Sequence, residues 1–495
     1  MKWDPRALAV VLLAITLVLL FQGTRDLWDP DEGRFTNVAL QMLRTGDFIS
    51  LYRHHETLHF TKPPFTYWAI AGSVSLFGWN PWATRLPNAL AYLGVVLLLL
   101  RIGRHFAPQR PWMPGLVYAT LPLPLLAAHL VTTDTLLAFA TTLAMTAYVI
   151  ARFEAKPRWM IVMWAAFGLA FMTKGPPGLV GLLPIALFQW LSPGGPRWVT
   201  RAGLGIFALV ALPWYLVVIQ RHDGLLSYFV GYEVVARIAT DTHNRHPEWW
   251  GGLYVYGLTF ALGALPWWPW ACLAGRRVGW RWSQSTEQTR LMLIWLGAAL
   301  LIFMVSRSRL PLYVLPLFAP LALLIAHQLE GVALTRGRCV VVTAVAGVVV
   351  GIKLLATSLP ALVPHLPSET AARVPLHKNA RLWADDLRAM APSTISEVVF
   401  VDDMARYGLH LYLQAEVRKV TFEGDMASKP ISDAPFDNLL ISALEAQPDP
   451  GRLFVMRISN AARFEAMASA SGLTPHRIGE RLGRAIYTVA PDPPD

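Results

Sequence analysis

Charged residues are scarce in this chain. Only 15% of its 495 residues are Asp, Glu, Lys or Arg, whereas 54% are hydrophobic, and the mean hydropathy is +0.41. Soluble globular domains carry about 25% charged residues, so this composition argues against a soluble protein. It predicts a chain that crosses a membrane several times.

Cysteine is rarer still, because Cys272 and Cys339 are the only two and both lie at the ends of apolar segments. Neither a disulfide framework nor a cysteine metal cluster is therefore expected. The sequence also lacks a glycine-rich phosphate loop, a solenoid repeat and an arginine-rich arm, which argues against a nucleotide site and against nucleic acid as a partner. The net charge of +11 comes mostly from Lys and Arg in short loops between apolar runs, a pattern that reflects membrane topology.

Apolar runs long enough to cross a bilayer are abundant. We predict about eleven transmembrane helices, or about eleven to thirteen when shorter segments are counted. The predicted spans are Ala7–Phe21, Leu86–Leu100, Met113–Leu130, Thr135–Ile150, Met160–Met172, Leu179–Leu191, Gly203–Ile219, Leu253–Leu273, Leu291–Val305, Pro311–His327 and Val340–Leu359. The short run Phe65–Phe77 begins after two prolines and predicts a re-entrant or interfacial helix. No small-x-small cleavage site follows the first run, which favours an uncleaved span over a signal peptide.

The basic residues test this count, because Lys and Arg collect in cytoplasmic loops. With the N-terminus inside, five cytoplasmic loops would hold Arg101, Arg104 and Arg110; Arg152, Lys156 and Arg158; Arg197 and Arg201; Arg276, Arg277, Arg281 and Arg290; and Arg336 and Arg338. The outer side then carries two large loops, 22–85 and 220–252, and everything after the last span. We predict a transmembrane domain over residues 1–360 and an outer domain over residues 361–495.

The C-terminal part is more polar than the rest. Strand-like runs ("VVFVDD", "LFVMRIS", "AIYTVA") alternate with helical patterns over Ala380–Met390 and Ala461–Ala470. This alternation predicts a small α/β domain. The predicted fold class is therefore an all-α polytopic membrane protein with a small α/β domain at its C-terminal end.

The first outer loop opens with an acidic stretch, "DPDEGRFTNVALQMLRTGDF", that begins at Asp29. We expect Asp29 to cap a helix, with Pro30 as its first residue and Glu32 completing a capping box. The acids would then simply suit the positive end of the helix. Asp31 and Arg34, one helical turn apart, favour a second interpretation, in which the arginine fixes a carboxylate above the membrane.

A second unusual stretch, "TKPPFTYW", follows in the same loop. Pro63 and Pro64 favour an extended backbone, which would hold the Lys62 cation at the outer edge of the membrane, where it suits a lipid phosphate. The simpler alternative is that Lys62 snorkels to the interface.

Other ionisable residues fall on the predicted outer side. An ionisable residue at the mouth of a span is a functional hypothesis by default. The candidates are Asp134 in "TTDTLL", Lys174 in "MTKGPPGLV", Arg307, Arg309 and Tyr313 in "SRSRLPLYVLP", and Glu233, Arg237, His243, Arg245 and His246 in the second loop. The single histidines there are more often surface residues than metal ligands.

With these motifs in order, the chain resembles the ArnT-like and protein mannosyltransferase-like membrane glycosyltransferases, which have the GT-C fold and use polyprenyl-phosphate sugars. The matching segments extend from Trp28 to about Pro316, and they are "DEGRFTNVALQMLRTGDF", "FTKPPFTYW", "TRLPNAL", "MTKGPPGLV", "ALPWY", the Glu233–Arg237 stretch and "SRLPLYVLP". The C-terminal part is similar only in position and in its rough α/β character.

The resemblance implies roles for individual residues. Asp31 matches the acid at the catalytic centre, Arg34 the arginine beside it, and Asp134 a second acid near the cavity. Lys62 matches a lysine that contacts the lipid phosphate. Candidate catalytic residues are thus Asp31, Arg34 and Asp134, and candidate substrate-binding residues are Glu32, Lys62, Lys174, Glu233, Arg237, Arg309 and Tyr313.

Two departures from the family pattern concern a metal. Relatives often carry glutamate before the Lys-Pro-Pro lysine, where this chain has Thr61, and histidine after the acid that matches Glu233, where it has Val234. No cofactor is required by the sequence, and a divalent metal stays an open alternative. His54, His55 and His59 are the substitute ligands that the chain offers.

The resemblance predicts an enzyme of the bacterial inner membrane whose active site faces the periplasm. It would move a sugar from a polyprenyl-phosphate donor to a lipid, glycan or protein acceptor, by a single inverting displacement. Membrane lipids and these two substrates are the expected partners. A flippase for lipid-linked sugars is the main alternative, although it should show paired repeats and charges deep in the bilayer; a structural subunit of an envelope assembly is another.

Overall fold

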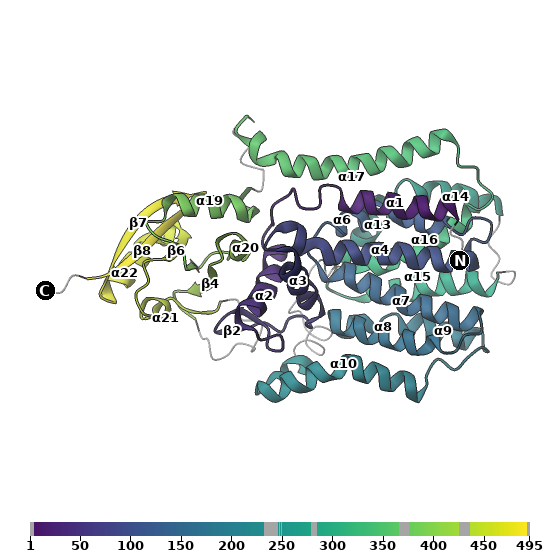
Figure 1. The fold of residues 1–495 in the computed structure, drawn as a ribbon, viewed down its shortest axis with the longest axis horizontal. Coiled ribbons are helices and arrows are strands. Elements are labelled where there is room, and N and C mark those ends of the chain that lie inside the picture. Colours follow the sequence, from purple (N-terminus) through teal and green to yellow (C-terminus); the bar gives the residue numbers. More distant parts are fainter. Residues whose placement is uncertain are drawn as a thin grey trace. The chain divides into compact units, whose positions relative to one another are not determined.

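A computed structural model describes residues 4–231, 246, 248, 250–278, 285–365, 376–424 and 436–492 of the chain. The chain forms two compact units (Figure 1). Unit 1 consists of Met1–Gln22, Lys62–Thr66 and Arg85–Leu355, and unit 2 of Gly23–Thr61, Tyr67–Thr84 and Ala356–Asp495. Unit 2 thus combines most of the first predicted outer loop with the C-terminal part. The division of the chain at residue 360 stays a prediction.

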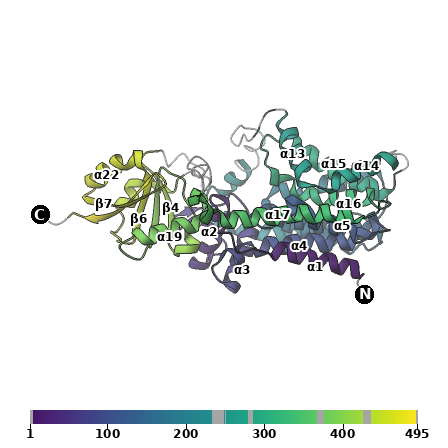
Figure 2. The ribbon, with the colours of Figure 1, turned by 90° about the horizontal axis from the view of Figure 1, so that it is seen from above.

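Unit 1 is a bundle of apolar helices (Figure 2). Its elements, including all but the first four residues of α4 and the last seven of α17, are α1 (Pro5–Leu19), α4 (Pro81–Phe106), α5 (Met113–Thr120), α6 (Pro122–Ala127), α7 (Thr133–Phe153), α8 (Trp159–Lys174), η1 (Pro176–Leu179), α9 (Leu182–Leu191), α10 (Arg201–Arg221), α11 (Leu225–Ser227), α13 (Gly251–Gly263), α14 (Trp267–Val278), α15 (Glu287–Val305), η4 (Pro311–Leu317), α16 (Phe318–Gln328) and α17 (Arg336–Leu362). Within the described residues, six helices are long and apolar enough to cross a membrane, and shorter apolar helices accompany them. The chain is a membrane protein, as its composition predicts.

Each of the eleven predicted spans is helical, but prolines break two of them. The run Met113–Leu130 is divided between α5 and α6, because Leu121 before Pro122 is extended, with ψ 129°, a conformation that a following proline favours. The run Leu253–Leu273 is divided around Pro266, where α13 ends at Gly263 and α14 begins at Trp267. The predicted helix Phe65–Phe77 forms with those bounds, as α3.

The centre of the bundle is α7, which packs against α8 on one side and against η4 on another. Of an apolar 18-residue stretch of α7, 78% is buried inside the protein, whereas for the corresponding stretches of α10 and α17 the buried share is only 22% and 17%. The apolar side chains that α10 and α17 expose would face lipid. Two buried aromatic residues of the bundle have partners for their polar groups: the Tyr92 hydroxyl donates to the Ala119 carbonyl at 2.6 Å and the Trp267 indole to the Thr120 hydroxyl at 2.8 Å.

Unit 2 is built around a six-stranded mixed sheet in the order β5-β4-β3-β6-β8-β7. The first four strands run parallel, and β6, β8 and β7 are antiparallel. The strands are β3 (Glu397–Val401), β4 (Glu416–Thr421), β5 (Asn438–Leu439), β6 (Arg452–Arg457), β7 (Leu473–Arg481) and β8 (Arg484–Pro491), and the helices around them are α19 (Ala380–Met390), α20 (Leu409–Leu413), α21 (Leu440–Leu444) and α22 (Ala461–Ala470). Because both faces of β3 are covered, all five of its residues are buried. The predicted α/β character is confirmed.

The remainder of unit 2 comes from the first loop. Helix α2 (Asp31–Thr45) leads to the hairpin β1 (Tyr52–His54) and β2 (Thr57–Leu58). Helix α2 packs against β1 and α20, and β1 packs against β4. The described residues of unit 2 also form short 3-10 turns, η5 (Val363–His365), η6 (Leu376–Lys378) and η7 (Ile458–Asn460).

Candidate functional site

The acidic stretch starts α2 one residue later than predicted. Pro30 is the N-cap, no side chain caps the helix, and Asp31 is its first residue. Asp29 is not the cap, because its carboxylate is buried and accepts a hydrogen bond at 3.1 Å from the Gly408 N–H of the sheet-bearing part. The predicted end is confirmed, since Gly46 closes the helix with φ 72°, in the left-handed region that glycine adopts without strain.

Asp31 and Arg34 form the pair that the sequence suggests. Their side chains are 73% and 37% exposed and lie 2.8 Å apart, from Asp31 Oδ1 to Arg34 Nη2. An exposed pair of this kind contributes about 0.2–1 kcal/mol at most. Stability therefore does not explain it, and Asp31 is open to solvent at the start of its helix.

Glu32 differs sharply from its neighbour. Its side chain is 6% exposed, accepts a hydrogen bond from the Trp28 N–H at 3.1 Å and pairs with Arg25 at 2.7 Å. The carboxylate thus turns back to the chain before the helix, but to Trp28, two residues before the N-cap Pro30, so the predicted capping box does not form. These contacts fit a structural role for Glu32 better than the predicted substrate-binding role.

Three of the predicted residues meet in unit 1. Asp134 lies in the first turn of α7 and Lys174 in the last turn of α8, and their charged groups form an ion pair. The Lys174 ammonium also lies 4.3 Å from the centre of the Tyr313 ring. Thr132 fixes Asp134 by donating to its carboxylate at 3.0 Å. The side chains of the ion pair are only 9% and 11% exposed, so removing one partner would leave a buried charge uncompensated.

Local sequence explains why this pair forms. Helices α7 and α8 are antiparallel neighbours, so the start of one lies beside the end of the other. A carboxylate suits the first turn of a helix and an ammonium the last turn. Gly175 then turns the chain sharply after Lys174, with φ 68°, a conformation available to glycine at little cost.

Arg309 is fixed by the backbone around it. It is 3% exposed, and its guanidinium donates to the carbonyls of His246, Glu248 and Met304. Gly251 and Gly252 leave room for it, because a Cβ at either position would lie within 3.3 Å of a guanidinium nitrogen. In this structure Arg309 therefore joins the start of α13 to the end of α15.

The remaining candidates are placed in part. Lys62 belongs to unit 1, is partly exposed and precedes Pro63 and Pro64 in a stretch of bends and a turn that leads to α3. Glu233 and Arg237 lie outside the described residues.

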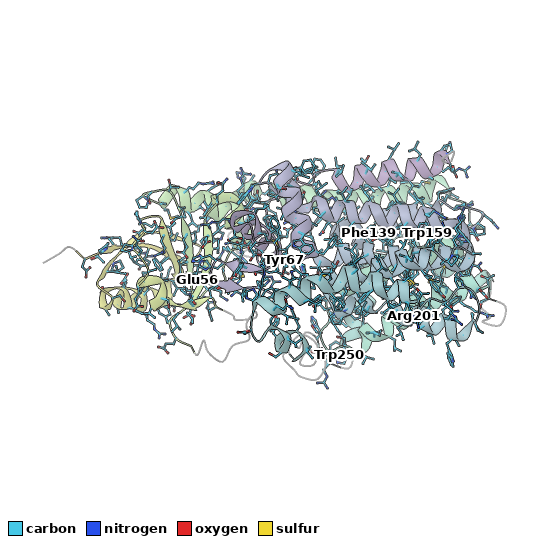
Figure 3. All side chains as sticks on the ribbon, turned by 60° about the horizontal axis from the view of Figure 1, so that its bottom comes forward. Glu56, Tyr67, Phe139, Trp159, Arg201 and Trp250 are labelled. Carbon is cyan, nitrogen blue, oxygen red and sulfur yellow. The ribbon has the colours of Figure 1, made fainter. Side chains whose placement is uncertain are left out.

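A buried ionic cluster in unit 2 was not predicted. His54 Nε2 lies 3.2 Å from Glu397 Oε1 and 3.0 Å from Glu416 Oε2. Arg452 pairs with Glu397 at 2.6 Å and Arg44 with Glu416 at 2.8 Å. Figure 3 labels Glu56, in the turn of the same hairpin, which pairs with Arg418 and with His55.

The electrostatics of this cluster follow from its carboxylates. Burial alone would lower the pKa of His54, but its hydrogen bonds to Glu397 and Glu416, together with the nearby charges of Glu416 and Asp437, raise it to about 9. Burial would raise the pKa of Glu416, yet the bonded imidazole of His54 holds it well below the usual range. His54 is therefore charged at neutral pH and bridges two acids.

His54, Glu397 and Glu416 are also close enough to hold a metal ion, since one ligand atom from each lies within 4.8 Å of the others. Their contacts argue against it. Both carboxylates are already paired with arginines. His59 is not part of the cluster and contacts the Thr61 hydroxyl at 2.9 Å.

Sequence reasoning missed Asp29 and the two acids of the sheet for different reasons. Burial raises the pKa of Asp29 to about 7, against the opposing effects of the Gly408 N–H and of Arg406, and nothing in "DPDE" marks which acid becomes buried. Glu397 and Glu416 each begin a strand. An acid before an apolar run looks like an ordinary strand end, so the sequence carries no signal for their meeting with His54.

The sequence was also compared with known protein families and with curated proteins. Residues 61–220 match the dolichyl-phosphate-mannose-protein mannosyltransferase family. Among curated proteins, the chain is 30% identical over 370 residues to undecaprenyl phosphate-alpha-4-amino-4-deoxy-L-arabinose arabinosyl transferase 2 of Pseudomonas fluorescens, which is 72% of this chain and 65% of that protein. It is 32% identical over 383 residues to the corresponding transferase of Pectobacterium atrosepticum, again 72% of this chain and 65% of the relative. The match thus spans slightly less than two thirds of these relatives.

A solved structure resembles the whole chain. It is ArnT from Cupriavidus metallidurans bound to undecaprenyl phosphate, with a TM-score of 0.73, 20% sequence identity and coverage of 97% of both chains. The apo form of the same protein gives a TM-score of 0.71. At this identity the likeness establishes the fold, and it extends over the membrane part and the C-terminal part alike.

Proposed function

We propose that this chain, which belongs to the ArnT-like and protein mannosyltransferase-like family with the GT-C fold, transfers a sugar from a polyprenyl-phosphate donor to an acceptor of the cell envelope. The observation that carries the proposal is the likeness over 72% of the chain to proteins named as arabinosyl transferases that use undecaprenyl phosphate. The fold supports it, since the solved ArnT structure binds undecaprenyl phosphate.

The proposed orientation puts the N-terminus in the cytoplasm and the chemistry in the periplasm. It is supported by the basic residues at one set of helix ends. The chain is thus proposed to act at the outer face of the bacterial inner membrane, where lipid A, as the acceptor to test first, is within reach.

The proposed reaction is one inverting displacement. An acceptor oxygen forms a bond to the anomeric carbon as the bond from that carbon to the phosphate oxygen breaks, and polyprenyl phosphate leaves. Asp31 would take the acceptor proton or orient the acceptor, for which its open position at the start of α2 is suitable. Arg34 would hold the Asp31 carboxylate in place.

Negative charge gathers on the leaving phosphate, so catalysis requires cations placed before the reaction. Lys62 is the proposed contact with this phosphate. Lys174 and Tyr313 are proposed to line the donor site beside Asp134, supported by the contacts of the three side chains in unit 1. The energy of the reaction resides in the donor, and no nucleotide is required.

Replacement of Asp31 by Asn tests the proposal. We expect loss of transfer with undiminished folding, because the side chain is exposed and its pair with Arg34 is weak. The measurement is mass spectrometry of envelope lipids and glycans from a deletion strain that carries the wild-type gene, Asp31→Asn or no gene. A glycosylated species that depends on the wild type, with donor accumulating in the other two strains, is the expected result. Full product from Asp31→Asn would remove Asp31 from the chemistry, and an unchanged envelope in the deletion strain would reject the proposed activity.

A further inference from the structure

Basic side chains converge on a single carboxylate where α7 ends. Glu154 follows the last residue of α7, and the last turns of α4 bring Arg101, Arg104 and His105 against it. Arg101 binds both carboxylate oxygens, at 2.7 and 2.9 Å, His105 lies at 3.1 Å, and Lys156 closes the group at 2.8 Å. We call these five side chains the Glu154 cluster.

The Glu154 cluster carries a surplus of positive charge. Its hydrogen bonds, that from Arg101 above all, hold the pKa of Glu154 well below its usual range, so the carboxylate is charged. One negative charge nevertheless faces three permanent positive ones, even with His105 neutral. A net charge of about +2 therefore remains.

The negative and positive groups also lie at different depths. The Glu154 side chain is 10% exposed, whereas those of Arg104 and Lys156 are 53% and 56% exposed. The carboxylate orients the cations from within, and their outer sides stay open. Arg and Lys presented in this way can bind a phosphate group by charge-assisted hydrogen bonds.

An apolar stripe leads along α4 to these cations. Leu90, Leu97, Arg101 and Arg104 are spaced by seven, four and three residues, which places them on one face of the helix. Leu90 and Leu97 are 57% and 42% exposed. From Leu97 and Leu90 to Arg104 the helix rises about 10 and 21 Å, which brackets the ~15 Å hydrocarbon depth of one leaflet.

An aromatic residue marks the membrane edge at the same place. Trp159, labelled in Figure 3, begins α8, and its backbone N–H donates to the Lys156 carbonyl at 3.0 Å. Tryptophan favours the membrane interface. The end of α7 thus brings together an apolar stripe on α4, a fixed group of cations and, three residues after Lys156, an interfacial tryptophan.

We propose that the Glu154 cluster binds the phosphate of an anionic phospholipid whose acyl chain lies along Leu90 and Leu97. The inference does not depend on the proposed enzymatic function. A role in membrane topology alone needs only net positive charge in the loop. It needs neither the convergence of α4 and the α7–α8 turn on one carboxylate nor the alignment of the cations with an exposed apolar stripe.

The experiment is a lipid titration of the full chain in detergent, read by native mass spectrometry. Phosphatidylglycerol is compared with phosphatidylcholine of the same acyl chains. The test variant is Arg104→Gln with Lys156→Gln, and the matched control is Arg201→Gln with Arg336→Gln, which removes equal charge from two exposed positions that begin α10 and α17. Figure 3 shows Arg201 toward the same end of the bundle as Trp159.

We expect wild type and control to bind phosphatidylglycerol in preference to phosphatidylcholine, and the test variant to bind it about 25-fold more weakly, at about fivefold for each of the two basic side chains. Millimolar inorganic phosphate should not displace the lipid, because it lacks the acyl chain. The single variant Lys156→Gln, which leaves both arginines in place, should show a smaller loss and serves if the double variant fails to fold. Equal affinity of wild type and test variant, an equal loss in the control, or displacement by phosphate would overturn the proposal.

Discussion

The strongest stability prediction concerns His54, whose imidazolium bridges Glu397 and Glu416 inside unit 2. Replacement by Gln keeps an N–H donor at this position but removes the charge. His54 is fully buried, and its pKa is raised from 6.5 to about 9. Folding therefore stabilises the protonated form relative to the unfolded chain.

The size and sign of the effect follow by linkage. A difference of this size corresponds to about 3 kcal/mol. Because the folded pKa is the higher one, the stabilisation is complete below pH 6.5 and is lost as the pH rises through 9. At about 2–4 °C for each kcal/mol, the unfolding midpoint should change by about 6–12 °C.

The assay is differential scanning calorimetry of the full chain in detergent between pH 6 and pH 9.5. The difference in midpoint between wild type and His54→Gln should be largest at pH 6 and shrink toward pH 9.5. His476→Gln is the control, since His476 is exposed on β7 of the same unit. A difference that is independent of pH, or an equal change in the control, would refute the bridging role of a charged His54.

Three further predictions concern buried charges. Lys174→Met and Asp134→Asn should each cost about 3–5 kcal/mol, and the double variant less than either; thermal unfolding measures this, and additive costs would contradict a direct pair. Arg309→Lys should destabilise the protein nearly as much as Arg309→Ala, because all three donors of a lysine ammonium lie on one nitrogen, whereas the guanidinium reaches the three carbonyls from both Nη1 and Nη2; a stable Arg309→Lys with normal donor use would instead favour the predicted substrate-binding role. In the wild type, the free energy of unfolding should fall as the pH rises from about 4 to about 7, because the folded pKa of Asp29, about 7, lies above the ordinary 3.8. Asp29→Asn should remove this fall. Unfolding midpoints at pH 5 and pH 7.5 test this, and an equal pH dependence in wild type and variant would contradict the burial of the charge.

Much of the fold could be predicted from the periodicity of apolar residues and from the residues that end helices. The helices Phe65–Phe77, Ala380–Met390 and Ala461–Ala470 form with the predicted bounds, because apolar spacing and helix-ending residues act locally. Strands β4 ("EVRKVT") and β7 ("LTPHRIGER") could not be predicted in this way. Their charged residues pair with residues far away in the sequence of unit 2, as Arg418 does with Glu56. No local sequence pattern predicts such partners.

The limits of sequence reasoning are clearest for the three acids at and just before the start of α2. Asp29, Asp31 and Glu32 share one helix start, and the helix dipole favours all of them alike. Tertiary contacts then make them different. The buried Asp29 carboxylate accepts a hydrogen bond from the Gly408 N–H, and Glu32 is buried in an ion pair with Arg25. Of the three acids, only Asp31 is exposed to solvent, beside Arg34. An acid that is neither buried nor paired with a buried partner is the one that a substrate can approach and that a substitution can change without unfolding the protein. The structure thus gives a physical reason, independent of any resemblance, to test Asp31 before its two neighbours.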